Sequence, residues 1–495
     1  MAFCIDSLRQ ASYREQMRVW ILGAGTLGVL VADHFVRELH DVVLIERDHA
    51  AAGEALRKVD CNVEICDGTD LAALRRLSID RADCFVAVTG SDEVNMVVCG
   101  LVAHAFNIPL KIARVRNPHY AMGISGDPEL FGIDHVLTPE IETAASILRS
   151  LEYGPIGQIA ALRRTSYSLR EVQITADGGL EGVTLSALRK SCSHPFIAPM
   201  LTRDREYVIV GGSTSLQRND TLYVFSTAEA FQELLARDGG RQTEQRGRVL
   251  ILGGSLIGVT LAQSLWTQSG EKAPNDRMIS RMMRQLQRQI SGHVTIVEPS
   301  EALCEQVSHL VPGAEVINAD IRDENKFTAE DYKRHDVAVA VGTNQEANIV
   351  GALHAKVKGV PRVGAVLYQD GYARIARSLG VDLPVSLRSC TVSAIASHLR
   401  GDAVKALYTI AGTSISIVEV VLAERSAFNG VPLSRAAFPR QTLILSITRD
   451  SKVIIPDGDE LLIAGDVVVA LTPRSNESTL IHLIRATRQM SRTTR

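Results

Sequence analysis

The chain repeats itself once, and this repeat limits the folds that its 495 residues can adopt. Residues 18–28 read RVWILGAGTLG, and residues 248–258 read RVLILGGSLIG. Farther along, AVTGSDEVNMVVCGLVAHAFNIP at 87–109 matches AVGTNQEANIVGALHAKVKGVP at 340–361. A third match relates GGSTSLQRNDTLYVF, which ends at residue 225, to DGDELLIAGDVVVAL, which ends at residue 471. Two tandem copies of a two-part unit therefore make up most of the chain.

The first part of each unit has the pattern of an α/β domain. Short apolar, β-branched runs such as VWILG, DVVLIE and CFVAVT alternate with helical patterns. Buried parallel strands read as continuous apolar runs, and crossover helices separate them. We therefore expect a doubly wound, Rossmann-like sheet. The second part, at 166–226 and 413–472, contains alternating strands and turn residues, which predicts a small α+β domain.

The repeat also sets the expected domain boundaries. Two helix-like stretches, 139–153 and 386–400, should join the parts of each unit. The expected segments are an N-terminal extension at 1–16, Rossmann-like domains at 17–140 and 246–390, and small α+β domains at 153–238 and 403–487.

The second copy carries an insertion at 267–291, which accounts for its extra length between the matched segments. Arginines and apolar residues recur in it at helical spacing. Such a basic amphipathic helix packs on its own domain or lies on a membrane or partner surface.

Composition excludes several classes of protein. The formal net charge of −3 provides no basic footprint for nucleic acid. The eight cysteines form no CxxC pair, and most lie in apolar runs, which predicts reduced core residues. No apolar run approaches the ~18–20 residues of a membrane helix, and the N-terminus lacks the apolar core of a signal peptide. We therefore expect a soluble, cytoplasmic protein, and no clear cluster of metal-ligating residues supports or excludes a bound cation.

A glycine-rich turn in the first copy predicts a nucleotide site. It follows an apolar strand and opens an amphipathic helix, which is the context that this motif requires. Glycine at 23 allows the tight turn, at 25 lets a pyrophosphate approach the backbone, and at 28 lets helix and sheet pack closely. The helix N-terminus presents free N–H groups and partial positive charge to phosphates. The motif consists of Gly23, Ala24, Gly25, Thr26, Leu27 and Gly28.

Glu46 supplies the carboxylate that such a site needs. It ends the next predicted strand, 18 residues beyond Gly28. A carboxylate there accepts hydrogen bonds from ribose hydroxyls and repels a 2′-phosphate. Strand, glycines, helix, strand and terminal acid in register are far more specific than the glycines alone.

The corresponding site in the second copy has diverged. Ser255 replaces the second glycine, so a side chain intrudes where phosphate would approach most closely. Glu298 still ends the matching strand. The acidic segment DGTD of the first copy corresponds in the second copy only to Asp320 and its neighbours. A weak or empty site and a functional one remain equally open here. Its candidate residues are Gly253, Gly254, Ser255, Leu256, Ile257, Gly258, Glu298 and Asp320.

Together these residues resemble the TrkA family, the cytosolic nucleotide-binding subunits of bacterial Trk potassium uptake systems. The resemblance spans about residues 17–487. Its distinctive segments are DGTD (67–70), AVTGSDEVN (87–95), IARVRNPHY (112–120), IDHVLTPE (133–140) and GTNQEANI (342–349).

The resemblance implies two RCK (regulator of potassium conductance) units per chain that bind NAD(H), or else ATP or ADP. It implies that Asp67 and Gly68 line the adenine pocket and that Thr89 and Glu93 flank the ligand. Arg114 would be a phosphate-binding or interface cation, or simply a solvated charge at a strand end. The family assembles rings beneath a membrane potassium-translocating subunit, on the inner face of the membrane. With two units per chain, a homotetramer would close an eight-unit ring.

Two other classes of function compete with a regulatory subunit. An NAD-dependent oxidoreductase needs a general acid or base near the nicotinamide and a substrate domain, and no convincing His–Asp or Lys–Tyr constellation is present. A redox-sensing repressor would need a helix-turn-helix motif or a basic surface. We therefore expect a non-enzymatic regulator, with an oxidoreductase as the alternative.

Overall fold

A computed structural model describes most of the protein. The described residues are 17–38, 40–126, 130–153, 168–175, 178–204, 206–237, 248–267, 293–321, 326–399, 404–409, 415–450 and 452–485. The extension at 1–16 and, apart from residue 267, the insertion at 267–291 lie outside these ranges. Within them, no helix combines the length and the apolarity needed to cross a bilayer.

The first N domain is a parallel sheet with the strand order β3-β2-β1-β4-β5-β6. Its strands are β1 (Arg18–Leu22), β2 (Asp41–Glu46), β3 (Asn62–Ile65), β4 (Cys84–Ala87), β5 (Leu110–Arg114) and β6 (His135–Leu137). Its helices are α1 (Thr26–Arg37), α2 (His49–Lys58), α3 (Leu71–Arg76), α4 (Asp92–Ala105), α5 (Pro118–Gly126) and α6 (Pro139–Tyr153). The order reverses between β1 and β4, and ligands bind at the carboxyl ends of strands at such a point.

The sequence determines locally where several helices start. The side chains of Asp48, Asp70 and Ser91 each accept a backbone N–H from the first turn of α2, α3 and α4, respectively. These caps satisfy N–H groups that have no partner inside the helix.

The second N domain repeats this sheet, with the order β13-β12-β11-β14-β15-β16. Its strands are β11 (Val249–Leu252), β12 (Val294–Glu298), β13 (Glu315–Asn318), β14 (Val337–Ala340), β15 (Arg362–Leu367) and β16 (Leu383–Ser386). Its helices are α9 (Leu256–Thr267), α11 (Glu301–Leu310), α12 (Ala329–Lys333), α13 (Gln345–Val357), α14 (Gly371–Leu379) and α15 (Leu387–Leu399). The predicted tandem, doubly wound architecture is confirmed.

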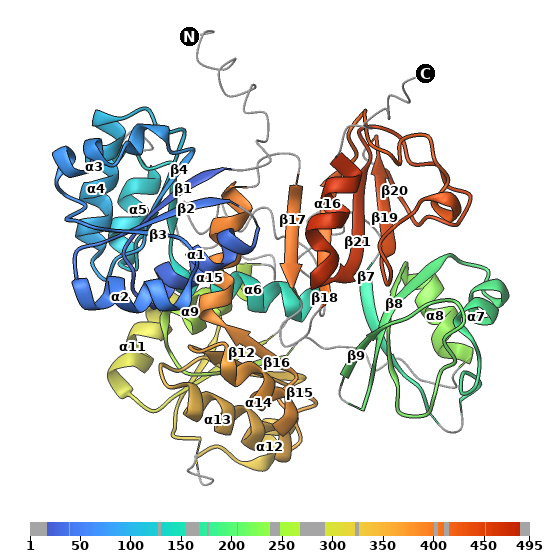
Figure 1. Ribbon diagram of the computed structural model, residues 1–495. Coiled ribbons are helices and arrows are strands. Elements are labelled where there is room, and N and C mark those ends of the chain that lie inside the picture. The colour runs from blue at the N-terminus through green and yellow to red at the C-terminus, as the bar shows by residue number, and fades with distance from the viewer. Residues whose placement is uncertain are drawn as a thin grey trace, which may run out of the picture.

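The two N domains exchange their last helices (Figure 1). Helix α6 follows the first sheet, but its Ile147 and Leu148 are buried in the core of the second, against Val249 and Ile251. Conversely, α15 follows the second sheet, but its apolar side chains are buried in the core of the first, beside α1. Those side chains are Val392, Ile395, Ala396 and Leu399. The helix-like stretches predicted to be connectors are therefore also core elements of the opposite domain.

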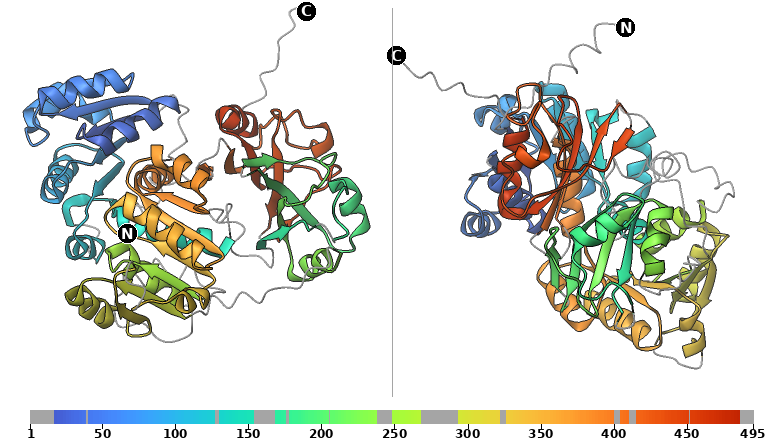
Figure 2. Two further views of the ribbon diagram at one scale, coloured as in Figure 1. Left: turned by 90° about the horizontal axis from the view of Figure 1, so that it is seen from below. Right: turned by 90° about the vertical axis from the view of Figure 1, so that its right-hand side faces the viewer.

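The two C domains are antiparallel sheets with helices on one side. The first contains β7 (Ser168–Gln173), β8 (Phe196–Arg203), β9 (Glu206–Ile209), β10 (Thr221–Ser226), α7 (Leu185–Ser191) and α8 (Ala228–Arg237). The second contains β17 (Val404–Thr409), β18 (Ile415–Val421), β19 (Leu443–Arg449), β20 (Lys452–Ile454), β21 (Val467–Pro473) and α16 (Glu477–Arg485). Phe225 of one sheet and Leu471 of the other lie in one shared apolar core, and Figure 2 shows the two domains side by side.

Candidate functional site

A cavity of about 760 Å³ opens at the carboxyl edge of the first sheet. Residues that follow β1, β2, β3, β4, β5 and β6 all contribute to its wall, as the strand reversal predicts. Its lining includes Gly23, Gly25, Thr26, Leu27, Glu46, Asp67, Gly68, Thr89, Arg114, Arg116, Glu140 and, from α15, Leu387, Arg388 and Thr391. Among the described residues, no cluster of three or more histidine, cysteine or carboxylate side chains is placed to hold a metal ion.

The glycine turn between β1 and α1 has the geometry that its sequence predicts. Gly23 has φ +102°, a conformation that other residues rarely adopt, and its N–H donates to the Ile45 carbonyl at 2.8 Å. A Cβ at position 28 would overlap the Gly23 carbonyl oxygen. Gly25 differs, because a Cβ there would meet nothing within 4 Å. The space that it leaves open belongs to the cavity, at the N-terminus of α1.

The Glu46 carboxylate braces this turn. One oxygen, Oε2, accepts the Ala24 N–H at 2.7 Å. The other, Oε1, accepts the N–H groups of Arg47 and Asp48 at 2.8 and 3.0 Å. An ionised carboxylate offers about four acceptor positions, so these three bonds leave one for a ribose hydroxyl. The structure thus gives Glu46 a second role, fixing the turn, that the motif alone did not reveal.

Asp67 and Gly68 lie on the same side of the cavity as Glu46. The N–H and hydroxyl of Thr69 both donate to Asp67 Oδ1, at 2.9 and 2.8 Å. These two hydrogen bonds lower the pKa of Asp67, so its carboxylate stays ionised well into the acid range. A Cβ at Gly68 would overlap the side chain of Leu22, which explains the glycine by packing.

Thr89 lines the cavity, whereas Glu93 is not among the lining residues. The Thr89 hydroxyl donates to Asn95 Oδ1 at 2.7 Å. The Glu93 carboxylate instead accepts the Ser91 hydroxyl at 2.7 Å, and this bond lowers the pKa of Glu93. The structure therefore places Glu93 at the first turn of α4, outside the set of residues that line the cavity.

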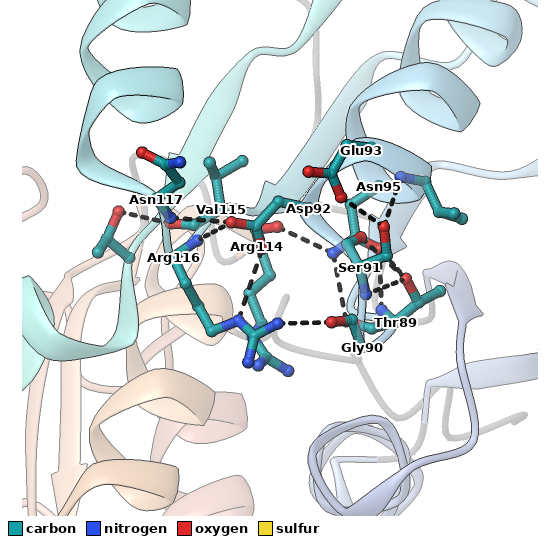
Figure 3. Close-up of polar contacts among 12 residues, drawn as sticks. Thr89, Gly90, Ser91, Asp92, Glu93, Asn95, Arg114, Val115, Arg116 and Asn117 are labelled. Atoms are coloured by element: carbon teal, nitrogen blue, oxygen red, sulfur yellow. Dashed lines mark hydrogen bonds and ion pairs between the residues drawn. The ribbon is translucent and has the colours of Figure 1, made fainter. Parts of the chain in front are cut away.

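Two buried residues that were not among the predicted site residues support the far wall of the cavity. Asn95 is fully buried, and its Nδ2 donates to the Arg114 carbonyl at 2.9 Å, which ties α4 to β5. Asp92 Oδ2 accepts the N–H groups of Arg116 and Asn117 at 2.9 and 2.8 Å. Figure 3 shows this network.

The internal repeat contained a signal for both residues. Asn348 donates to the Val366 carbonyl at 2.9 Å, just as Asn95 does to the Arg114 carbonyl. Gln345 accepts the N–H groups of Tyr368 and Gln369 at 3.0 Å, as Asp92 does in the first copy. The matched asparagines and the conserved spacing could have identified this scaffold.

Arg114 and Arg116 bring positive charge to this wall. The Arg116 Nη2 donates to the Gly90 carbonyl at 2.5 Å, and its Nε lies 3.6 Å from Asp92 Oδ1. The Arg114 Nε is buried and has no hydrogen-bond partner within the described part of the chain. Burial and the neighbouring Arg116 lower the pKa of Arg114. A half-buried guanidinium whose Nε has no protein partner can donate a charge-assisted hydrogen bond to an anion.

The second N domain has the same turn, but the Ser255 side chain stands at the position of Gly25. Gly253 has φ +119°, and the Gly254 N–H donates to Glu298 Oε2 at 2.7 Å. Ser255 Oγ donates to the Val341 carbonyl at 2.6 Å, across the position that lies open at Gly25. Leu256 and Ile257 begin α9, and the Ile257 side chain is buried in the core.

The remaining candidates of the second domain keep their positions in the fold. A Cβ at Gly258 would overlap the Gly253 carbonyl oxygen, which repeats the packing at Gly28. Asp320 directly follows Ala319, whose N–H donates to the Glu298 carbonyl at 3.2 Å. The framework of the first turn is thus retained, with the Ser255 side chain at the position of Gly25.

Family models match both kinds of domain. The TrkA-N domain matches residues 19–139 and 276–387, and the TrkA-C domain matches residues 417–485. These matches cover more than half of the chain. The chain belongs to the TrkA family.

Full-length relatives agree with this assignment. The chain is 28% identical over 469 residues to the Trk system potassium uptake protein TrkA homolog 1 of Methanosarcina mazei, covering 93% of this chain and 98% of that protein. It is 27% identical to the Trk system potassium uptake protein TrkA of Haemophilus influenzae over 470 residues, 93% of this chain and 97% of that protein. Among solved structures, the GsuK channel has a similar fold, with a TM-score of 0.51 at 15% identity over 95% of this chain and 79% of that one.

Replacing Gly25 with valine should abolish nucleotide binding and leave the fold intact. The backbone at Gly25 (φ −64°, ψ 179°) suits a branched residue, and the added atoms project into open space where phosphate would lie. We expect micromolar binding by the wild type, about 7–8 kcal/mol, to fall below detection in calorimetry. Gly28→Ala is the contrasting control, since its overlap with Gly23 should lower the melting temperature. Binding by Gly25→Val at wild-type affinity would disprove the assignment.

Proposed function

We propose that this protein is a nucleotide-binding regulatory subunit of a membrane potassium uptake transporter. The observation that carries the proposal is the cavity of the first N domain, which is lined by an open glycine turn, an oriented carboxylate at one end and an arginine with an unpartnered Nε at the other. Two relatives with nearly the same length are named as Trk system potassium uptake proteins. Docking on the transporter would place the protein at the inner face of the membrane.

The ligand of this site would be an adenine nucleotide, a class that includes NAD(H), ADP and ATP. Its phosphates would lie above Gly25, where the N–H groups of α1 and the helix dipole favour negative charge. Glu46 would accept a ribose hydroxyl, and Asp67 and Gly68 would border the adenine side. Arg114 would then gain the anionic partner that it lacks.

The two nucleotide sites of each chain should differ in affinity. The Ser255 hydroxyl donates a hydrogen bond to the Val341 carbonyl beside the second glycine turn. A ligand bound at this turn must displace that hydrogen bond. We expect calorimetry to resolve two classes of site. Ser255→Gly should tighten the weaker class, and the stronger class serves as an internal control. Two indistinguishable classes in the wild type would contradict this inequality.

A homotetrameric ring is the assembly that we propose for these chains. Val97 on α4 and Val350 on α13 occupy equivalent positions of the repeat, and both are exposed, by 46% and 65%. Val357 lies two turns farther along the same face of α13 and is 85% exposed. Apolar side chains at matching positions on both N domains fit a head-to-tail ring, which reuses one kind of contact at each junction.

Light scattering should therefore give the mass of a tetramer at micromolar concentration. Replacing both Val97 and Val350 with glutamate should reduce that mass, because charges at apolar contacts must be desolvated. Both positions are exposed, so the melting temperature of the chain itself should change little. A monomeric wild type, with and without nucleotide, would rule out the ring.

Ligand binding would regulate the transporter by shifting the ring between two states. A tenfold preference for one state at each site corresponds to ~1.4 kcal/mol. Over four or eight sites, this preference suffices to move a concerted gate. The exchanged helices α6 and α15 would transmit the movement, since each is anchored in the opposite N domain.

Deleting the gene should reduce growth at limiting potassium and lower measured potassium uptake. Wild-type protein should restore uptake, whereas Gly25→Val, expressed at the same level, should not restore its nucleotide-dependent part. If uptake is unchanged by deletion in a cell without a second copy, the regulatory function fails. Turnover of NADH with hydroxy or keto acids would then test the oxidoreductase alternative.

A further inference from the structure

The second unit contributes side chains to the nucleotide cavity of the first. Leu387, Arg388 and Thr391 lie in the first turns of α15 and line the cavity beside residues that follow β5 and β6. The exchange of helices explains how they reach it, because α15 is buried along the first sheet from Val392 onward. The first site is therefore incomplete without the second N domain.

The cavity is chemically different at its two ends. At the β2 and β3 end lie Glu46, Asp67 and Gly68, which suit a ribose and a base. At the β5 and β6 end the charged lining residues are Arg114, Arg116, Glu140 and, from α15, Arg388. Between the two ends lies the glycine turn, where the first phosphates would sit. A ligand that extends past this turn therefore meets guanidinium groups.

The positive charge at the β5 and β6 end exceeds what the protein itself neutralises. Arg116 is engaged by Asp92 and the Gly90 carbonyl. Neither Arg114 nor Arg388 forms an ion pair or a side-chain hydrogen bond within the described part of the chain. Glu140 and Asp92 are the carboxylates that act on Arg114, and the buried Oε2 of Glu140 likewise lacks a hydrogen-bond partner in the described residues. Arg114, Arg116 and Arg388 together outnumber the two carboxylates Asp92 and Glu140, and this excess of positive charge favours an anion over an uncharged ring.

We propose that Arg388 of the second unit binds the terminal phosphate of a nucleoside di- or triphosphate held in the first unit. This inference rests on the proposed nucleotide function of the first site. An NAD molecule would place its uncharged nicotinamide riboside, or its positively charged oxidised ring, at this end and would gain little from Arg388. A nucleotide with a free terminal phosphate would bridge Arg114 of the first unit and Arg388 of the second, and so fasten α15 to the first sheet.

Calorimetric titration of the full-length chain tests this inference with ATP, AMP and NAD⁺ as probes. Arg388→Gln should weaken ATP binding about tenfold, the cost of one charge-assisted contact, and should change AMP and NAD⁺ binding less than about twofold. Arg388→Lys should retain most of the ATP affinity. Arg374→Gln is the matched control, because Arg374 is exposed on α14 of the same unit and does not line the cavity.

A second measurement tests the link between the units. Hydrogen exchange across residues 387–399 should slow when ATP binds to the wild type and should respond much less in Arg388→Gln at saturating ATP. Melting temperatures within a few degrees of the wild type would show that the variants fold.

The possible outcomes separate this inference from the proposed function. Unchanged ATP affinity in Arg388→Gln, or equal losses for ATP, AMP and NAD⁺, would overturn the role of Arg388 and leave the nucleotide site standing. A wild type that binds none of the three probes would refute the proposed function, and this inference with it.

Discussion

The apolar packing of two exchanged helices holds the N domains together, and the candidate site depends on it. Five large side chains (Ile147, Leu148, Val392, Ile395 and Leu399) are buried in the opposite domain. At about 2 kcal/mol each, their burial contributes on the order of 10 kcal/mol, which is comparable to the net stability of a whole domain. Each N domain would expose part of its core if the exchanged helix were removed. The first turns of α15, which line the cavity, thus belong to the first site although they follow the second sheet in sequence.

Much of the fold could be predicted from the sequence because the repeat presents each pattern twice. The strands β1, β2 and β4 read as continuous apolar runs, and parallel strands covered on both faces must read so. The three residues of β6 were too short for a periodic signal. The exchange of α6 and α15 was also beyond reach, since an apolar helix face shows that a helix is buried and does not show in which core.

The candidate site likewise has a part that the sequence predicts and a part that it does not. Gly23, Gly25, Gly28 and Glu46 are local to one strand–turn–helix–strand segment, so their spacing alone predicts their geometry. Glu93 is placed beside the ligand only by the family resemblance; its carboxylate accepts the Ser91 hydroxyl at the start of α4, and it is not among the residues that line the cavity. Arg388 lies more than 360 residues from the glycine turn in sequence, and only the path of α15 brings it to the cavity.

The matching positions of Glu140 and Arg388 show what covalent linkage permits. Each is the second residue of its exchanged helix, α6 or α15, and both line the one cavity. In a dimer of identical single units, equivalent positions must carry the same residue, so two like charges would face a shared site. Duplication within one chain removes this symmetry. One copy can then become a ligand-holding half and the other a supporting half, and a change such as Ser255 in the second turn leaves the first turn untouched.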